Sequence, residues 1–250
     1  MEKHSSPNKE LIPLGKWTSE KLDAILHESS KINDAGLRID FLSKQFLGTP
    51  YQESTLIGDI NTPEVFVINL EGVDCFTFLD YIESMRRSFS FDEFKENLRK
   101  VRYRGGEVNF KNRNHFFTDW RKFNSNFIDD VTVQIGGKKV RSMMKLLNQR
   151  EDGSYYLPGI QLKDRLSTYL PVDMIDDTIL SEFRTGDYIG IYSEIQGLDV
   201  SHVGIFIKEE NKTYFRHASS HEEHRKVVDQ DFGDYITKKP GILIFRSKKS

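Results

Sequence analysis

The 250-residue sequence has one cysteine, Cys75, which excludes an intrachain disulfide and a cysteine-rich zinc site. It has no apolar run of the about 18 residues that a membrane-spanning helix needs. Its first residues, Met1–Glu10, lack the apolar core of a signal peptide. A formal net charge of −2 argues against a general nucleic-acid binder. The remaining composition is that of an ordinary globular protein, long enough for one substantial core.

Patterns of apolar and capping residues predict helices first and strands later. Helices are predicted over 19–27, 35–46, 75–85, 90–103 and about 114–123, and strands over 187–192, 200–207, 213–218, 225–228 and 242–246. This order indicates an α+β fold. Residues 1–15 look loose and polar, and residues 16–250 form a single domain. The pattern is poor over 131–171, where we expect a strand, a turn and mixed segments.

Cys75 lies where a nucleophile is expected. It follows the apolar run Glu64–Leu70 and the turn-like Glu71–Asp74. Asp74 is a good N-cap residue, so Cys75 should occupy the first turn of a helix. The positive end of the helix dipole there favours thiolate over thiol. The alternative is that a lone cysteine is a small buried hydrophobic residue.

Two histidines lie on neighbouring predicted strands, joined by the loop Lys208–Asn211. If all four loop residues close the hairpin, His202 lies directly opposite His217 on the same face. Opposed Cβ atoms in an antiparallel pair are roughly 4.5–5.5 Å apart. One imidazole could then act as a base while the second ring orients it. The inference depends on register, because a shift of one residue would separate the rings.

Several motifs carry a resemblance to a known family. Gly48–Tyr51, Asp74-Cys75 and Asp199–Ile205 resemble motifs of the NlpC-type papain-like cell-wall hydrolases. The chain is most similar to the N-acetylmuramoyl-L-alanine amidase-like branch, formerly a domain of unknown function. The segments that support this branch are 74–78, 102–105, 115–120, 197–204 and 217–220.

Two departures from the wider superfamily match that branch. Phe76-Thr77 stands where the superfamily usually has Ser-Gly after the nucleophile, and Glu53–Leu70 lengthens the gap between Tyr51 and Cys75. We therefore treat about 53–70 and 131–171 as family-specific insertions.

The resemblance implies a papain-like fold, in which the cysteine helix packs on an antiparallel sheet that carries the histidines. Cys75 would attack an amide carbonyl, His202 would move the proton, and His217 would orient His202. His221 and His224 compete with His217 for the third role. The implied reaction cleaves the amide between N-acetylmuramic acid and L-alanine, through a thioester. We expect a monomer that acts on muropeptide or peptidoglycan fragments without a cofactor or a metal.

The resemblance and the residue types also suggest substrate contacts. Tyr51 would line the site or simply pack after its proline, and Asp74 and Ser201 flank the catalytic residues. The segment His115–Trp120, with Asp119 and Trp120, could form a substrate wall, or Trp120 could be a core residue. Arg104, like Arg102, could bind carboxylates of an acidic stem peptide or pair with nearby acids.

Other classes of function stay open at this stage. An endopeptidase of the same superfamily would cut between D-glutamate and the diamino acid. A non-catalytic cell-wall binding module would bind without forming product, and a redox thiol would lack a resolving cysteine. The run His221–His224 suggests metal ligands, but its spacing of three differs from the His-Glu-x-x-His pattern. Members of the resembled branch are commonly exported, so we expect the cell envelope if a signal peptide was removed, and otherwise the cytoplasm.

Overall fold

The computed structural model describes residues 9–248, and it confirms the α+β class. The helices are α1 (Ser19–Ser30), α2 (Ala35–Lys44), α3 (Cys75–Arg86), α4 (Phe91–Arg102), α5 (Phe117–Phe123), α6 (Thr132–Gly136), α7 (Asp177–Ser181) and α8 (Phe232–Ile236), with 3-10 turns η1 (Arg104–Gly106), η2 (Phe110–Asn112), η3 (Gly137–Lys139) and η4 (Val172–Met174). The strands are β1 (Glu10–Leu11), β2 (Phe66–Val67), β3 (Ile128–Asp130), β4 (Arg141–Leu147), β5 (Lys163–Tyr169), β6 (Asp187–Tyr192), β7 (Val200–Glu209), β8 (Lys212–Ala218), β9 (Val227–Asp231) and β10 (Ile242–Ser247). No helix in this range is long and apolar enough to cross a membrane.

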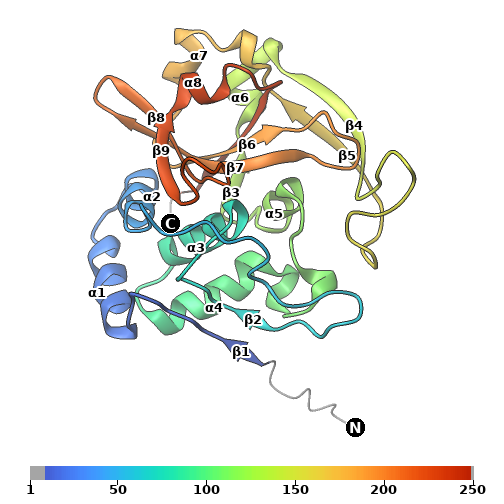
Figure 1. Cartoon of the computed structure of the whole chain (residues 1–250). Coiled ribbons are helices and arrows are strands. Elements are labelled where there is room, and N and C mark those ends of the chain that lie inside the picture. The colour runs from blue at the N-terminus through green and yellow to red at the C-terminus, as the bar shows by residue number, and fades with distance from the viewer. Residues whose placement is uncertain (1–8, 249–250) are drawn as a thin grey trace.

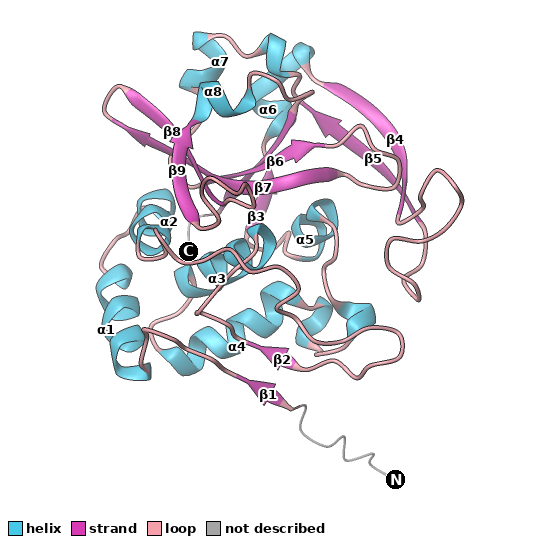
Figure 2. Cartoon of the chain, viewed as in Figure 1, coloured by secondary structure: helices cyan, strands magenta, loops and turns pink. Residues whose placement is uncertain are grey.

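The main sheet has six strands in the order β3-β10-β6-β7-β8-β9, and every neighbouring pair is antiparallel. Helices α1 to α5 lie on one side of this sheet, and the short helices α6 to α8 lie on the other (Figures 1 and 2). A separate hairpin, β4-β5, extends from the sheet half. The molecule is therefore layered, with the sheet between two sets of helices.

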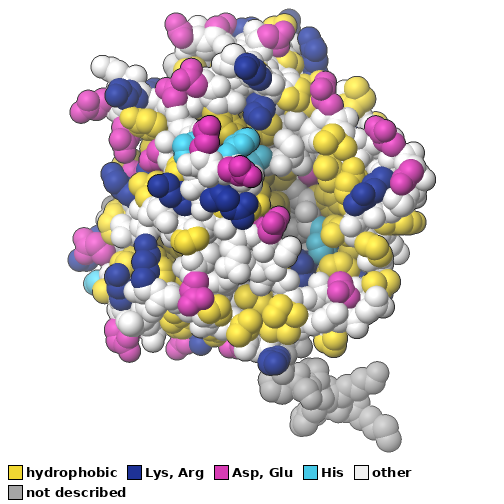
Figure 3. All heavy atoms as spheres, viewed as in Figure 1, with side chains coloured by type: hydrophobic (Ala, Val, Ile, Leu, Met, Phe, Trp, Pro, Cys, Tyr) yellow, Lys and Arg dark blue, Asp and Glu magenta, His cyan; other side chains and the backbone are white. Residues whose placement is uncertain are grey.

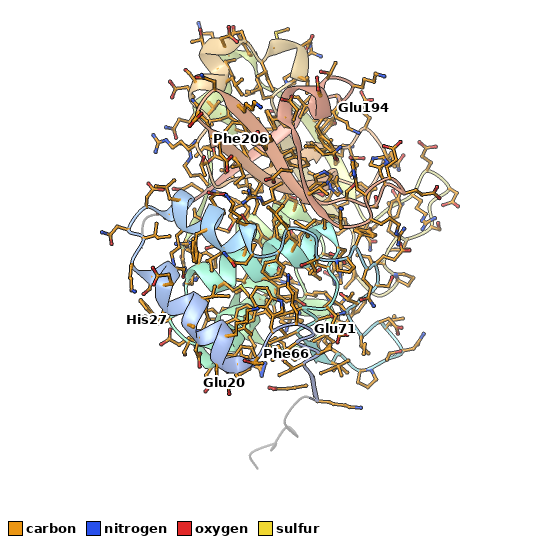
Figure 4. The ribbon with its side chains drawn as sticks, turned by 60° about the vertical axis from the view of Figure 1, so that its left-hand side comes forward. Glu20, His27, Phe66, Glu71, Glu194 and Phe206 are labelled. Carbon is orange, nitrogen blue, oxygen red and sulfur yellow. The ribbon has the colours of Figure 1, made fainter. Side chains whose placement is uncertain are left out.

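Alternating side chains on the central strands fill both faces of the sheet. On β7, Val203, Ile205 and Ile207 join the core shared with the long helices, while Phe206 joins the core shared with α7 and α8. Figure 4 shows Phe66 among the side chains of the helical half and Phe206 in the sheet. Because β7 is buried on both faces, its sequence is a nearly continuous apolar run.

Predicted helix starts agree with the capping geometry. The side chains of Thr18, Asp34, Asp74 and Ser90 each accept a hydrogen bond from a backbone N–H in the first turn that follows. These caps satisfy N–H groups that have no partner within a helix. The N-terminal halves of α1 to α4 were therefore predictable from local sequence.

Two predictions about connecting segments were wrong. Residues 9–15 are not loose, because the carbonyls of Lys9, Leu11 and Pro13 accept hydrogen bonds from residues 66, 68 and 70 at 2.9–3.0 Å. This pairing also orders the insertion at 53–70. In the insertion at 131–171, the strand expected before the glycine turn is instead the short helix α6, and the following segments form the β4-β5 hairpin. Residues 1–8 lie outside the described range.

A buried ion pair connects α3, the helix that begins at Cys75, to its neighbouring elements. Asp80 on α3 accepts hydrogen bonds from Arg102 Nε at 2.8 Å and from Trp120 Nε1 at 3.0 Å. Arg102 also donates to the carbonyl of Val67 at 2.6 Å. Both charged side chains are almost fully buried. Asp80 therefore joins α3, α4, α5 and β2 at one point.

We expect Asp80→Ala to lower the free energy of unfolding by about 3–5 kcal/mol, because it leaves the Arg102 charge buried without its partner. Glu28→Ala is the control: it breaks an exposed pair with Lys31 and should cost less than about 1 kcal/mol. Chemical denaturation monitored by circular dichroism measures both. Equal effects of the two substitutions on the free energy of unfolding would contradict the role of the Asp80–Arg102 pair in stabilising the fold.

Candidate active site

Cys75 is the first residue of α3, as predicted. The Asp74 side chain accepts hydrogen bonds from the backbone N–H groups of Phe76 at 2.9 Å and Thr77 at 2.7 Å. In return, Thr77 Oγ1 accepts the Asp74 N–H at 3.0 Å, which completes a capping box. Asp74 thus starts the helix, and these contacts give it a positioning role rather than the predicted contact with substrate.

The thiol of Cys75 is half-buried and neutral. Burial, followed by the Asp74 charge, raises the pKa of Cys75 to about 12. The backbone N–H groups of Val203, Cys75 and Phe76 act in the opposite direction. The expectation of a thiolate in the free enzyme was therefore wrong, because desolvation outweighs the helix dipole at this position.

His202 and His217 meet as predicted, with His202 Nε2 2.7 Å from His217 Nδ1. The predicted register, however, was wrong by two residues. The hairpin loop has only Glu210 and Asn211, and Glu210 has a left-handed φ of +50°. A shift of two residues keeps each side chain on its face, so the rings are diagonal neighbours rather than directly opposed.

A third polar side chain determines which nitrogen of each ring carries the proton. His217 Nε2 lies 2.6 Å from the amide oxygen of Gln230, which can only accept, so this nitrogen is protonated. The other nitrogen of neutral His217 then accepts from His202 Nε2–H. His202 is left with an unprotonated Nδ1, which is the nitrogen that a base needs.

Both imidazoles are neutral at physiological pH. Burial, followed by the neighbouring His217, lowers the pKa of His202 to about 3. Burial lowers the pKa of His217 to about 4, although the hydrogen bond with Gln230 opposes this shift. The three-residue chain therefore holds one tautomer over the whole neutral range.

Cys75, Ser201 and His202 line the same cavity of about 270 Å³. The other lining residues, most of them apolar or aromatic, are Phe76, His115, Phe116, Phe117, Tyr156, Leu157, Leu198, Asp199, Val200 and Val203. Ser201 is exposed, so it is available to a ligand. The cavity provides a largely uncharged site beside the thiol.

Part of the cavity wall comes from the excursion between β4 and β5. Tyr156 and Leu157 belong to this excursion, and the fully buried Asn148 holds it in place. The Asn148 side chain accepts the Leu157 N–H at 2.7 Å and donates to the carbonyls of Leu157 and Ile160. Its own N–H donates to the carbonyl of Gly197 at 2.9 Å. The predicted insertion therefore contributes directly to the site.

Asp199 holds a second wall in position. Its Oδ2 accepts hydrogen bonds from the backbone N–H and the hydroxyl of Thr118, both at 2.7 Å, and its Oδ1 accepts the Val200 N–H at 2.8 Å. These bonds fix the start of α5, and with it Phe116 and Phe117, against the start of β7. The aspartate of the predicted motif is thus a positioning residue in this structure.

Three predicted substrate contacts lie away from the cavity. Trp120 is fully buried and bonded to Asp80, and Asp119 is buried between Lys163 and Arg165. Both are core residues, so the predicted substrate wall does not include them.

Arg104 donates to the carbonyl of Lys111 and lies over the ring of Phe123. It therefore does not reach the cavity, and Arg102 is the buried partner of Asp80.

Sequence reasoning missed three residues close to the catalytic candidates. Gln230 was missed because the predicted strand ended at Val228, whereas β9 runs to Asp231. Tyr235 on α8 packs against the rings of His202 and His217, with centroids 6.3 and 4.9 Å away. Tyr156 lies on the insertion, where the pattern was poor. Of the three, only Gln230 could have been found from local sequence, by extending the predicted strand beyond Val228.

The run His221–His224 lies in the loop between β8 and β9. Within residues 9–248, no group of three or more His, Cys, Asp or Glu side chains is placed to hold a metal ion. His224 Nε2 instead lies 3.4 Å from Gln230 Nε2. His217, and neither of these two histidines, contacts His202 directly.

Comparison with known proteins gives consistent results. A Legionella pneumophila protein assigned to the family DUF1460 superposes with a TM-score of 0.77 at 23% identity, over 92% of this chain and 94% of its own, which shows a shared fold. An N-acetylmuramoyl-L-alanine amidase from Bacteroides uniformis superposes with a TM-score of 0.72 at 27% identity, over 86% of this chain and 99% of its own. A Bacteroides fragilis protein provisionally described as a xylanase has a TM-score of 0.64 at 26% identity, over 82% and 98%. No curated protein matches the chain.

The sequence pattern of one family covers most of the chain. It matches residues 41–242, which include the nucleophile helix, both histidines and the whole cavity wall. The chain therefore belongs to the N-acetylmuramoyl-L-alanine amidase-like family.

Proposed function

We propose that this protein is a cysteine-dependent amidase that cleaves the bond between N-acetylmuramic acid and L-alanine in peptidoglycan fragments. The observation that carries the proposal is the chain from His202 to His217 to Gln230, together with the cavity that Cys75 and His202 both line. The family supplies the type of bond. A cysteine at a helix start and a histidine on a neighbouring strand, lining one cavity, resemble the arrangement of papain-like hydrolases, which supports the proposal.

The neutral pair determines the order of events. His202 Nδ1 removes the thiol proton as sulfur attacks the amide carbonyl, which forms a tetrahedral intermediate. The proton then passes to the leaving nitrogen of L-alanine, and the carbon–nitrogen bond breaks to give a thioester. Water, deprotonated by the same imidazole, hydrolyses the thioester and releases the muramoyl carboxylate. His217 stays neutral and accepts the Nε2–H bond throughout.

The start of α3 supplies the first donor for the developing oxyanion. The Asp74 side chain accepts the N–H groups of Phe76 and Thr77, which leaves the Cys75 N–H directed at its own sulfur. One such donor is typically worth roughly 3 kcal/mol in the transition state. Tyr51, whose backbone pairs with Val73 two residues before Cys75, is our candidate for a second polar contributor.

The cavity argues against a glycosidase, the activity that the name of the Bacteroides fragilis relative suggests. Glycosidases use two carboxyl groups on either side of the scissile bond. Among the described residues that line this cavity, Asp199 is the one carboxylate. Its oxygens already accept hydrogen bonds from Thr118 and Val200. A thiol and an imidazole are the groups left for catalysis.

The first test uses defined muropeptides with and without the muramoyl sugar, and products are identified by mass spectrometry. We expect the wild type to release free sugar and intact peptide. Cys75→Ala should reduce the rate by at least about 1,000-fold while its melting temperature stays near the wild-type value. A chelator should have no effect.

Other outcomes of this experiment would indicate one of the two alternative functions. A cut inside the peptide, with a requirement for a free L-alanine amine, would indicate the endopeptidase. Binding without product, unchanged in Cys75→Ala, would indicate the binding module.

Substitutions of the two histidines separate the base from its orienting partner. His202→Ala should lower kcat by about 100- to 10,000-fold, because the base is removed. His217→Asn should be milder, since an amide oxygen can still accept the His202 Nε2–H. Steady-state kinetics on the same muropeptide measure both. Substantial activity in His202→Ala would overturn the base assignment.

The pH dependence tests the role of Gln230. His202 must be neutral to act as a base, so activity is lost only as the pH falls toward its pKa of about 3, and kcat/KM should stay constant down to about pH 5. Gln230→Glu places a carboxylate beside His217 and raises the pKa of that imidazole. Protonated His217 cannot accept from His202, so the acid limb of the profile should move to higher pH.

Gln230→Leu is the matched control. It removes the acceptor without adding charge, so it should lower kcat/KM at every pH and leave the acid limb near the wild-type position. Identical profiles for the two variants would show that Gln230 does not act through His217.

A further inference from the structure

Two tyrosines in the neighbourhood of Cys75, Tyr51 and Tyr235, each have a cation over the ring. The Arg225 guanidinium lies 5.3 Å from the ring centroid of Tyr51, and Lys239 Nζ lies 5.3 Å from that of Tyr235. Neither tyrosine lines the cavity described above. The two pairs come from separate segments, a loop before β9 and the turn after α8.

Both tyrosines are close to the catalytic residues. Tyr51 forms a backbone bridge with Val73, two residues before Cys75. Tyr235 packs against His202 and His217. The negative charge of a Cys75 thiolate contributes, after burial, to the raised pKa of each tyrosine. The two rings therefore lie near enough to Cys75 to interact with its charge.

The two cations have no carboxylate partner. Within residues 9–248, neither Arg225 nor Lys239 takes part in an ion pair, and the loop acids Glu222 and Glu223 do not reach them. Arg225 is exposed and Lys239 is partly exposed. An unpaired cation beside a nucleophile is available to a negatively charged group of the substrate.

The backbone holds Arg225 in an uncommon conformation. Its φ is +42°, a left-handed value that a side chain with a Cβ rarely adopts. Two hydrogen bonds impose it: the Arg225 N–H donates to His221 and the Arg225 carbonyl accepts the Tyr51 N–H, both at 2.9 Å. The same bonds that fix Tyr51 beside Cys75 therefore also direct the guanidinium over its ring.

The cavity and the two tyrosines thus differ in the charged groups around them. The cavity is largely aromatic and apolar, with its one carboxylate internally bonded. Within the described part of the chain, Arg225 and Lys239 lie over the two tyrosine rings without ion pairs, and the carboxylates of Asp74 and Glu53 also act on Tyr51. Figure 3 shows His, Lys and Arg side chains in the middle of the face it draws, interspersed with Asp and Glu, and hydrophobic side chains gathered to the right.

We propose that Arg225 and Lys239 bind the carboxylates of the stem peptide and so set the direction in which the substrate lies. The muramoyl group then occupies the aromatic cavity, and the peptide crosses Tyr51 and Tyr235. This inference rests on the proposed amidase function, because it assigns the two ends of that substrate to the two sides of Cys75. It makes the enzyme selective for acidic over amidated stem peptides.

The test compares two muramoyl-L-alanyl substrates that differ only at the α-carboxyl group of the following D-glutamate, free in one and amidated in the other. Arg225→Gln and Lys239→Gln should each raise KM for the acid roughly tenfold and change KM for the amide by less than about twofold, with kcat retained. Added salt should weaken binding of the acid alone. Arg225→Lys should recover part of the loss.

Two neighbouring lysines provide matched controls. Lys226→Gln and Lys238→Gln remove the same charge next to each site, but neither side chain lies over a tyrosine, so both variants should resemble the wild type. Equal losses in the controls, or equal losses for acid and amide, would overturn the proposal.

A binding measurement separates this proposal from the proposed function. Calorimetry on Cys75→Ala, with the same two substrates, needs no turnover. Preference for the acid that depends on Arg225 and Lys239 supports the inference even if the wild type cleaves neither substrate, in which case the amidase proposal alone fails. Hydrolysis of both by the wild type, with no such preference in binding, retains the amidase and rejects the inference.

Discussion

The point at which α3 begins determines the rest of the site. The capping box between Asp74 and Thr77 fixes that point, and so makes Cys75 the first helical residue. A start one residue later would rotate the thiol by about 100° away from β7. The buried pair of Asp80 and Arg102, one turn further on, fixes the same helix against the rest of the core. The helix cap and the buried ion pair therefore together determine the position of the Cys75 sulfur atom.

The parts that could be predicted from sequence depend on local interactions. Helix starts followed from capping residues such as Asp34 and Ser90, whose partners are three positions away. The pairing of His202 with His217 also followed, although the loop is two residues shorter than expected. Side-chain direction in a strand repeats every two residues, so an error of two preserves the face and an error of one does not.

The rest depends on contacts between distant segments, which leave no local pattern. Asp119 and Trp120 have the composition of a substrate wall, but partners on β5 and α3 bury them. The excursion that carries Tyr156 is held in part by the buried amide of Asn148, whose side-chain partners, Leu157 and Ile160, lie 9 and 12 residues further along the chain. The burial of these side chains and the identity of their partners cannot be predicted from the residues next to them in the sequence.

The neutral resting state has a consequence for catalysis. In a site where the thiol and His202 are both uncharged, the backbone donors at the start of α3 have no full charge to stabilise before reaction. In the proposed mechanism, charge develops on the oxyanion and the imidazole together as sulfur attacks, so the donors and His217 would act on the transition state more than on the ground state. The burial that disfavours a thiolate would, in that mechanism, also lower the reactivity of the thiol toward solvent oxidants before substrate binds. In such a mechanism, the desolvation that raises the pKa of the Cys75 thiol would also favour its reaction with a bound substrate over its reaction with solvent oxidants.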